Sequence, residues 1–236
     1  MKRARGPFLR AKWKNLLLVT YKVSDDLLQP YLSPGLEFDR LEGSALVSLV
    51  AFDVRDTRVN SLAIPGLINF PEVNLRFYVR HGERRGVVFV REFVSSHLIA
   101  WIARTLYNEP YKAVPMKSHT IIRGTQIKIE HDLTISRRTH HIGVEAEGSP
   151  NIPAMNSREH FLKEQEWGFG RSRSGDVLRY RVEHPRWSVY PNPRATLDVD
   201  FAALYGARWS VLQHLNPFSL VLAEGSEIAV WPKEKV

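Results

Sequence analysis

Four polar residues recur at every second position in one stretch of the chain. They are Glu72, Asn74, Arg76 and Tyr78, and the residues between them are apolar. This alternation predicts a β-strand over 73–79 with its polar side chains on one face. If that face lines a cavity, Arg76 can anchor an anion, Asn74 can bind the same ligand, and Glu72 can orient it or act as a base. The alternative is a solvated sheet face with cross-strand ion pairs.

A second pair of charged residues follows in the next expected strand. A turn around Gly82 and the apolar pattern of 86–93 predict a β-hairpin with the first strand. Arg91 and Glu92 are adjacent, so they point to opposite faces, and one of them joins the polar face. Both are candidate ligand-binding residues. An ion pair between Arg76 and either Glu72 or Glu92 is the alternative interpretation.

Two further candidates lie in a proline-bounded segment after a predicted helix over 97–107. Tyr111 and Lys112 follow Glu109 there, and we treat the segment as a loop. Loops on a rigid scaffold often carry function. Tyr111 is therefore a candidate hydrogen-bonding and proton-transfer residue, and Lys112 a candidate anion anchor or nucleophile. Alternatively, the prolines only fix the path of the chain.

Several kinds of chemistry are excluded or unsupported. The chain has no cysteine, which excludes disulfides, thiol nucleophiles and cysteine-ligated zinc or iron–sulfur sites. The spacing of His160 and Glu164 suits one helical turn, but no His-Glu-x-x-His motif or third ligand accompanies them, so we expect no metal. No nucleotide-binding or serine-hydrolase motif occurs, and we expect no cofactor.

The charge balance does not indicate a polyanion partner. Among 236 residues, 33 Lys and Arg face 25 Asp and Glu, which gives a net charge of +8. The basic runs are short and lie at expected turns and at the N-terminus, so we expect no specific nucleic-acid partner. No apolar segment is long enough to span a bilayer or to form a signal peptide, which predicts a soluble cytoplasmic protein with no membrane partner.

Short β-like runs separated by turn signals dominate the chain, and few helices interrupt them. Besides 97–107, helices are expected over 158–166 and 198–205, and the segment GFGRSRSGD is expected to form a hairpin-like turn. No repeat or low-complexity linker divides the sequence. We therefore expect one α+β domain over 1–236, with a mostly antiparallel sheet or barrel and a few outer helices.

The order of several segments resembles the YqjF-like family of uncharacterised bacterial proteins, also called the domain of unknown function 2071 (DUF2071) family. The matching segments include KWKNLLLVTYKV, FPEVNLRFYV, LYNEPYKAVPM, FLKEQEWGF, VEHPRWSVYP and AEGSEIAVW. They cover nearly the whole chain in order. The resemblance implies no activity, because the family has none established.

More distantly, the layout resembles acetoacetate decarboxylase and its relatives, which implies a cone-shaped β-barrel around a closed cavity. Those enzymes carry a Schiff-base lysine in a Pro-Lys-Lys motif after an Arg-Glu pair. Arg91-Glu92 match the pair, and Pro110-Tyr111-Lys112 match the motif. Tyr111 thus stands at the position of the Schiff-base lysine, and Lys14 falls near the position of a cavity arginine.

A tyrosine cannot form an imine with a ketone, so the resemblance favours binding over decarboxylation. We therefore expect a cavity-containing protein that binds a small anionic oxo or carboxylate compound. The alternative is a divergent lyase or decarboxylase-like enzyme that uses Lys112, and the sequence does not decide whether the protein is an enzyme. A homo-oligomer is compatible with both interpretations.

Overall fold

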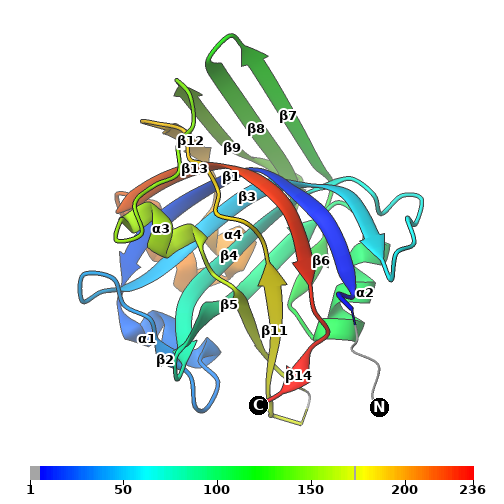
Figure 1. Cartoon of the computed structure of the whole chain (residues 1–236). Coiled ribbons are helices and arrows are strands. Elements are labelled where there is room, and N and C mark those ends of the chain that lie inside the picture. The colour runs from blue at the N-terminus through cyan, green and yellow to red at the C-terminus, as the bar shows by residue number, and fades with distance from the viewer. Residues whose placement is uncertain (1–5, 173) are drawn as a thin grey trace.

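The described part of the chain folds into two β-sheets with short helices between and around them (Figure 1). The computed structural model describes residues 6–172 and 174–236, so the basic residues 1–5 lie outside the described part. The first sheet has ten strands and the second has four. Among the described residues, no helix is long and apolar enough to cross a membrane. The expected α+β class, mostly β with few helices, is confirmed.

The ten-stranded sheet is mixed. β5 pairs in parallel with β6 and β10, and the other pairings are antiparallel. β4 pairs with both β3 and β5, so the pairings run from β4 through β3, β1, β13, β11, β10 and β5 back to β4. The strands are β1 (Leu9–Val23), β2 (Glu37–Phe38), β3 (Ala45–Val59), β4 (Phe70–His81), β5 (Arg84–Val94), β6 (Tyr111–Ala113), β10 (Trp167–Arg171), β11 (Val177–Glu183), β13 (Ser219–Val230) and β14 (Glu234–Lys235).

The four-stranded sheet extends away from the large sheet, as β7, β8 and β9 show in Figure 1. Its order is β12 (Arg194–Asp198), β9 (Arg138–Glu147), β8 (Gln126–Ile135) and β7 (Met116–Arg123). The helices are α1 (Asp25–Leu28), α2 (His97–Tyr107), α3 (Arg158–Lys163) and α4 (Phe201–Tyr205), with 3₁₀ turns η1 (Gln29–Tyr31) and η2 (Ala207–His214).

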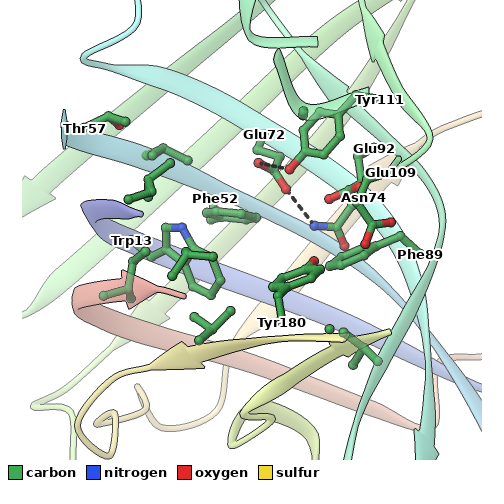
Figure 2. Close-up of a pocket in the computed structure, with 18 of the residues that line it drawn as sticks. Trp13, Phe52, Thr57, Glu72, Asn74, Phe89, Glu92, Glu109, Tyr111 and Tyr180 are labelled. Carbon is green, nitrogen blue, oxygen red and sulfur yellow. Dashed lines mark hydrogen bonds between the residues drawn. The ribbon is translucent and has the colours of Figure 1, made fainter. Parts of the chain in front are cut away.

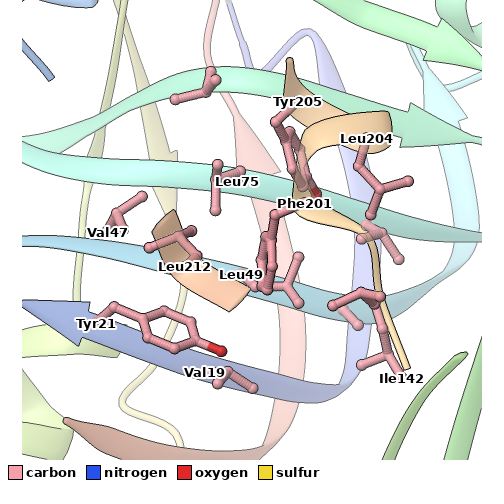
Figure 3. Close-up of a cluster of buried hydrophobic side chains, with 14 of the residues drawn as sticks. Val19, Tyr21, Val47, Leu49, Leu75, Ile142, Phe201, Leu204, Tyr205 and Leu212 are labelled. Atoms are coloured by element: carbon pink, nitrogen blue, oxygen red, sulfur yellow. The ribbon is translucent and has the colours of Figure 1, made fainter. Parts of the chain in front are cut away.

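The apolar face of β4 packs into the larger hydrophobic core. Leu75 contributes to this cluster together with Phe201 and Tyr205 of α4 and Ile142 of β9 (Figure 3). Because side chains of a strand alternate, the packing of Leu75 toward α4 directs the polar residues of β4 to the opposite side of the sheet.

The predicted hairpins and helices are present, and two helices are shorter than expected. β4 and β5 form the hairpin around Gly82, and β10 and β11 form the hairpin of the GFGRSRSGD segment. The helix expected over 158–166 is α3, which ends at Lys163 because the backbone of Glu164 leaves the helical region. The helix expected over 198–205 is α4, which begins at Phe201 because the Asp200 side chain caps it by accepting from the Ala203 N–H at 2.9 Å.

Candidate ligand-binding cavity

A cavity of about 170 Å³ lies on the polar side of β4. Much of its wall is aromatic, and the Trp13 and Phe52 rings meet edge to face with centroids 5.2 Å apart (Figure 2). Such a volume suits a molecule of a few heavy atoms, since an apolar cavity of about 150 Å³ holds one benzene. An apolar wall that surrounds a few convergent polar groups is typical of small-molecule sites.

Three glutamates and a tyrosine form an acidic cluster in this cavity (Figure 2). Strand register brings them together, because Asn74 of β4 lies opposite Glu92 of β5, and Glu92 lies beside Tyr111 of β6. Glu72 accepts from Asn74 Nδ2 at 3.1 Å and from the Tyr111 hydroxyl at 3.4 Å. Glu109, just before β6, completes the cluster, and all three glutamates are at most 6% exposed.

Burial changes the protonation of this cluster. Desolvation raises the pKa of Glu72 to about 7 and that of Glu109 to about 8. Desolvation, with repulsion from Glu109 and Glu72, raises the pKa of Glu92 well above its usual value. Burial and the neighbouring glutamates raise the pKa of Tyr111 as well. At neutral pH much of the cluster is therefore protonated and can donate hydrogen bonds.

Two cationic side chains line the same cavity. Arg76 is 6% exposed, and its Nη2 donates to the Leu162 carbonyl at 3.3 Å, which joins β4 to α3. Lys163 follows Leu162, and its side chain is fully buried and ion-paired with Glu164. Desolvation lowers the pKa of Lys163, although the pair with Glu164 opposes this effect.

Several buried polar atoms of the lining lack a hydrogen-bond partner within residues 6–172 and 174–236. Buried polar groups are normally paired with protein, water or ligand, because an unpaired one costs about 1–3 kcal/mol. Donors and acceptors are both present, so a ligand with a single charged end and a hydrogen-bonding group can satisfy more than one of them. The atoms are Thr57 Oγ1, Asn74 Oδ1, Arg76 Nε, Glu92 Oε2, Glu109 Oε1 and Gln165 Oε1.

The structure brings five of the eight candidate site residues together at the cavity. They are Glu72, Asn74, Arg76, Glu92 and Tyr111. The four alternating residues of β4 are all buried, so the alternative of a solvated sheet face is wrong, and three of the four line the cavity.

The other three candidates lie outside the cavity lining, and strand alternation explains each placement. Lys112 is exposed because Tyr111, its neighbour in β6, points inward. Lys14 is exposed because Trp13 faces the cavity. Arg91 lies on the face opposite to Glu92, where it donates to the Leu204 carbonyl of α4.

Four cavity residues carried no signal that singled them out from the sequence. Lys163 and Gln165 belong to a charged stretch that is typical of a solvated helix. Tyr180 lies within the ordinary strand β11, and His184 directly follows it. Gly168 was one signal in the sequence for the close packing of Tyr180. A Cβ there would lie 2.2 Å from the Tyr180 ring, so only glycine lets that ring pack against β10. Within the described residues, no three His, Asp or Glu side chains are grouped to hold a metal.

Comparisons with known proteins agree with this architecture. Residues 10–227 match the family model DUF2071, described as an uncharacterized conserved protein. The chain is 32% identical over 230 residues to the uncharacterized protein YqjF of Bacillus subtilis (strain 168), which covers 96% of this chain and 92% of that protein.

Two kinds of solved structure share the fold at low sequence identity. The enduracididine biosynthesis enzyme MppR complexed with pyruvate superposes with a TM-score of 0.67 at 12% identity, covering 99% of this chain and 91% of that one. Acetoacetate decarboxylase from Legionella pneumophila gives a TM-score of 0.66 at 15% identity, covering 100% and 92%. The chain therefore has an acetoacetate decarboxylase-like fold.

Proposed function

The chain belongs to the DUF2071 family of uncharacterized conserved proteins, and from that premise we propose that its buried cavity binds a small anionic oxo or carboxylate compound. One observation carries this proposal. Arg76 and a cluster of largely protonated carboxyl groups present unpartnered polar atoms to one small, mostly apolar cavity.

The protonation of the glutamates decides the sign of the ligand's charge. Three ionised carboxylates would repel an anion, but burial keeps much of this cluster neutral near pH 7. The Arg76 guanidinium then attracts a carboxylate, which it can bind through two parallel hydrogen bonds. The protonated glutamates and Tyr111 donate to the remaining oxygen atoms of the ligand.

The structural neighbours support a ligand of this class. MppR has the same fold, and its structure was solved in complex with pyruvate, a small oxo acid. We infer that the closed circuit of strand pairings corresponds to the cone-like barrel of that fold, and that Tyr111 replaces its Schiff-base lysine. Lys112 is exposed, so it does not supply an amine inside the cavity for the imine-forming alternative.

Calorimetric titration with a panel of small acids tests the proposal. The panel contains pyruvate, 2-oxobutyrate, lactate and propionate, with acetone and ethanol as neutral counterparts. We expect at least one acid to bind and the neutral compounds not to bind. Replacing the guanidinium in Arg76→Gln removes a charge-assisted contact worth about 1.5–3 kcal/mol and should weaken binding at least roughly tenfold.

Arg80→Gln is the matched control, because Arg80 lies on the same strand but is exposed and pairs with Glu37. Its affinity for the acid should equal that of the wild type. Equal loss in both variants would mean that general charge, not the cavity, attracts the anion. Failure of every acid to bind to the wild type would refute the proposed function.

A further inference from the structure

A fully buried lysine, Lys163, lines the cavity. Lys163 is the last residue of α3, and its side chain has no exposed surface. Lysine is among the residues least often buried completely, because its charge and its flexible stem favour water. A buried lysine that borders a cavity is therefore more informative than one packed among apolar side chains.

The surroundings of Lys163 hold its amine in one place. Glu164 pairs with Nζ and also accepts from the Trp187 backbone N–H at 3.2 Å. The His184 Nδ1 lies 3.7 Å from the same carboxylate, and its ring stacks on Trp187 with centroids 4.0 Å apart. An amine with a fixed position and an adjacent proton acceptor meets the geometric requirement for a nucleophile.

We propose that Lys163 captures the carbonyl group of a small aldehyde, ketone or oxo acid in the cavity as an imine, an inference that rests on the proposed binding function. Lys163 comes from a helix, whereas Tyr111 and Lys112 come from β6, so this amine occupies a position that the Pro110-Tyr111-Lys112 segment does not predict. Arg76 also lines the cavity and donates to the carbonyl of Leu162, the residue before Lys163, so it can hold the carboxylate of an oxo acid near the amine.

The reaction balances without an oxidant or a reductant. Glu164 takes a proton from the Lys163 ammonium group, and the freed lone pair attacks the carbonyl carbon. A C–N bond forms while the C=O π bond breaks, and the nitrogen passes a proton to the oxygen. Glu164 then returns its proton to the resulting hydroxyl group, which leaves as water. The product is a protonated imine beside the Glu164 carboxylate.

The charged groups around Lys163 act on it in opposite directions. Glu164 and Glu159 favour its ammonium form, whereas desolvation and Arg186 favour the neutral amine. Desolvation is the largest of these influences and lowers the pKa of Lys163. His160 and His184 are close enough for the charge of Lys163 to lower their pKa values, and Arg76 acts on His184 in the same direction.

Reductive trapping tests the inference on the whole protein. Pyruvate, and separately propionaldehyde as a neutral probe, are incubated with the protein and cyanoborohydride at about pH 7.5, and adducts are mapped by peptide mass spectrometry. We expect Lys163 to react at least about tenfold faster than any exposed lysine, because its amine is held in one place beside a proton acceptor in the cavity where the probe binds. Labelling confined to exposed lysines would overturn the inference.

Two variants and one control separate chemistry from a structural ion pair. Lys163→Arg should lose the adduct, and Lys117→Arg, at an exposed site on β7, should keep it. Glu164→Gln keeps the amine but removes its anionic partner, so the pH profile of labelling should move to lower pH. An unmoved profile would contradict the assigned pairing. Circular dichroism confirms folding, and wild-type mapping decides the matter if Lys163→Arg does not fold.

The outcomes distinguish this inference from the proposed function. Binding of pyruvate without an adduct at Lys163 would refute the imine and leave anion binding intact. An adduct of propionaldehyde at Lys163 in a protein that binds no acid would support the reactive amine and refute the anion site.

Discussion

Glu72→Gln removes one ionisable group from the centre of the cavity while nearly preserving the shape of the side chain. Glu72 accepts hydrogen bonds from Asn74 and Tyr111, and the glutamine carbonyl can keep one of them. The substitution therefore isolates the free energy that the protein loses when this buried carboxyl ionises.

The magnitude follows from the difference in pKa between the folded and unfolded states. Burial raises the pKa of Glu72 from 4.5 to about 7. Below pH 4.5 both states hold the proton and the contribution to stability is complete. As the pH rises from there to about 7, mainly the unfolded state releases the proton, so the free energy of unfolding falls. Between about pH 5.5 and about pH 8 this loss is on the order of 2 kcal/mol.

Urea unfolding followed by tryptophan fluorescence across this pH range measures the effect. Wild-type stability should fall as the pH rises, with Glu92 and Glu109 contributing in the same direction because burial raises their pKa values too. In Glu72→Gln, the fall in the free energy of unfolding across this pH range should be smaller than in the wild type by at least about 2 kcal/mol. The substitution also relieves the repulsion that Glu72 exerts on Glu92 and Glu109. Glu83→Gln, at an exposed position of the β4–β5 turn, should parallel the wild type.

A Glu72→Gln profile that runs parallel to the wild type would refute the reasoning. It would mean that Glu72 ionises as easily in the folded protein as in the unfolded chain, and that the cavity is wetter than its burial implies. The proposed attraction of anions by a neutral cluster beside Arg76 would then lose its basis.

Two other substitutions probe the walls of the cavity. Tyr111→Phe removes the hydroxyl group that donates to Glu72, and it should weaken binding of a recognised acid roughly fivefold, or about 1 kcal/mol, in calorimetry; unchanged affinity would place the ligand elsewhere. Gly168→Ala puts a Cβ 2.2 Å from the Tyr180 ring and should cost about 1–3 kcal/mol in thermal unfolding. Gly6→Ala, with nothing within 4 Å of its Cβ, should melt like the wild type, and equal melting of both variants would contradict this packing.

Local patterns predicted the strands and one wall of the site. The alternation over 72–79 identified the face that carries Glu72, Asn74 and Arg76, because strand side chains alternate wherever the strand is placed. The same rule required that Arg91 and Glu92 lie on opposite sides, but it did not say which one faces inward. The segment that contains Tyr111 and Lys112 was expected to be a loop. It is instead a short strand paired with β5, and this pairing determines that Tyr111 faces the cavity and Lys112 does not.

The sequence by itself determined the period of each strand, the hairpins around Gly82 and within GFGRSRSGD, and the absence of cysteine chemistry, because these depend on near neighbours in the chain. Tertiary structure decided which polar side chains meet. Lys163 lies 87 positions after Arg76 in the numbering, and only the packing of α3 against β4 places both at one cavity. Burial, which also depends on the complete fold, decided that the glutamates there hold their protons and that the buried amine releases its own more readily.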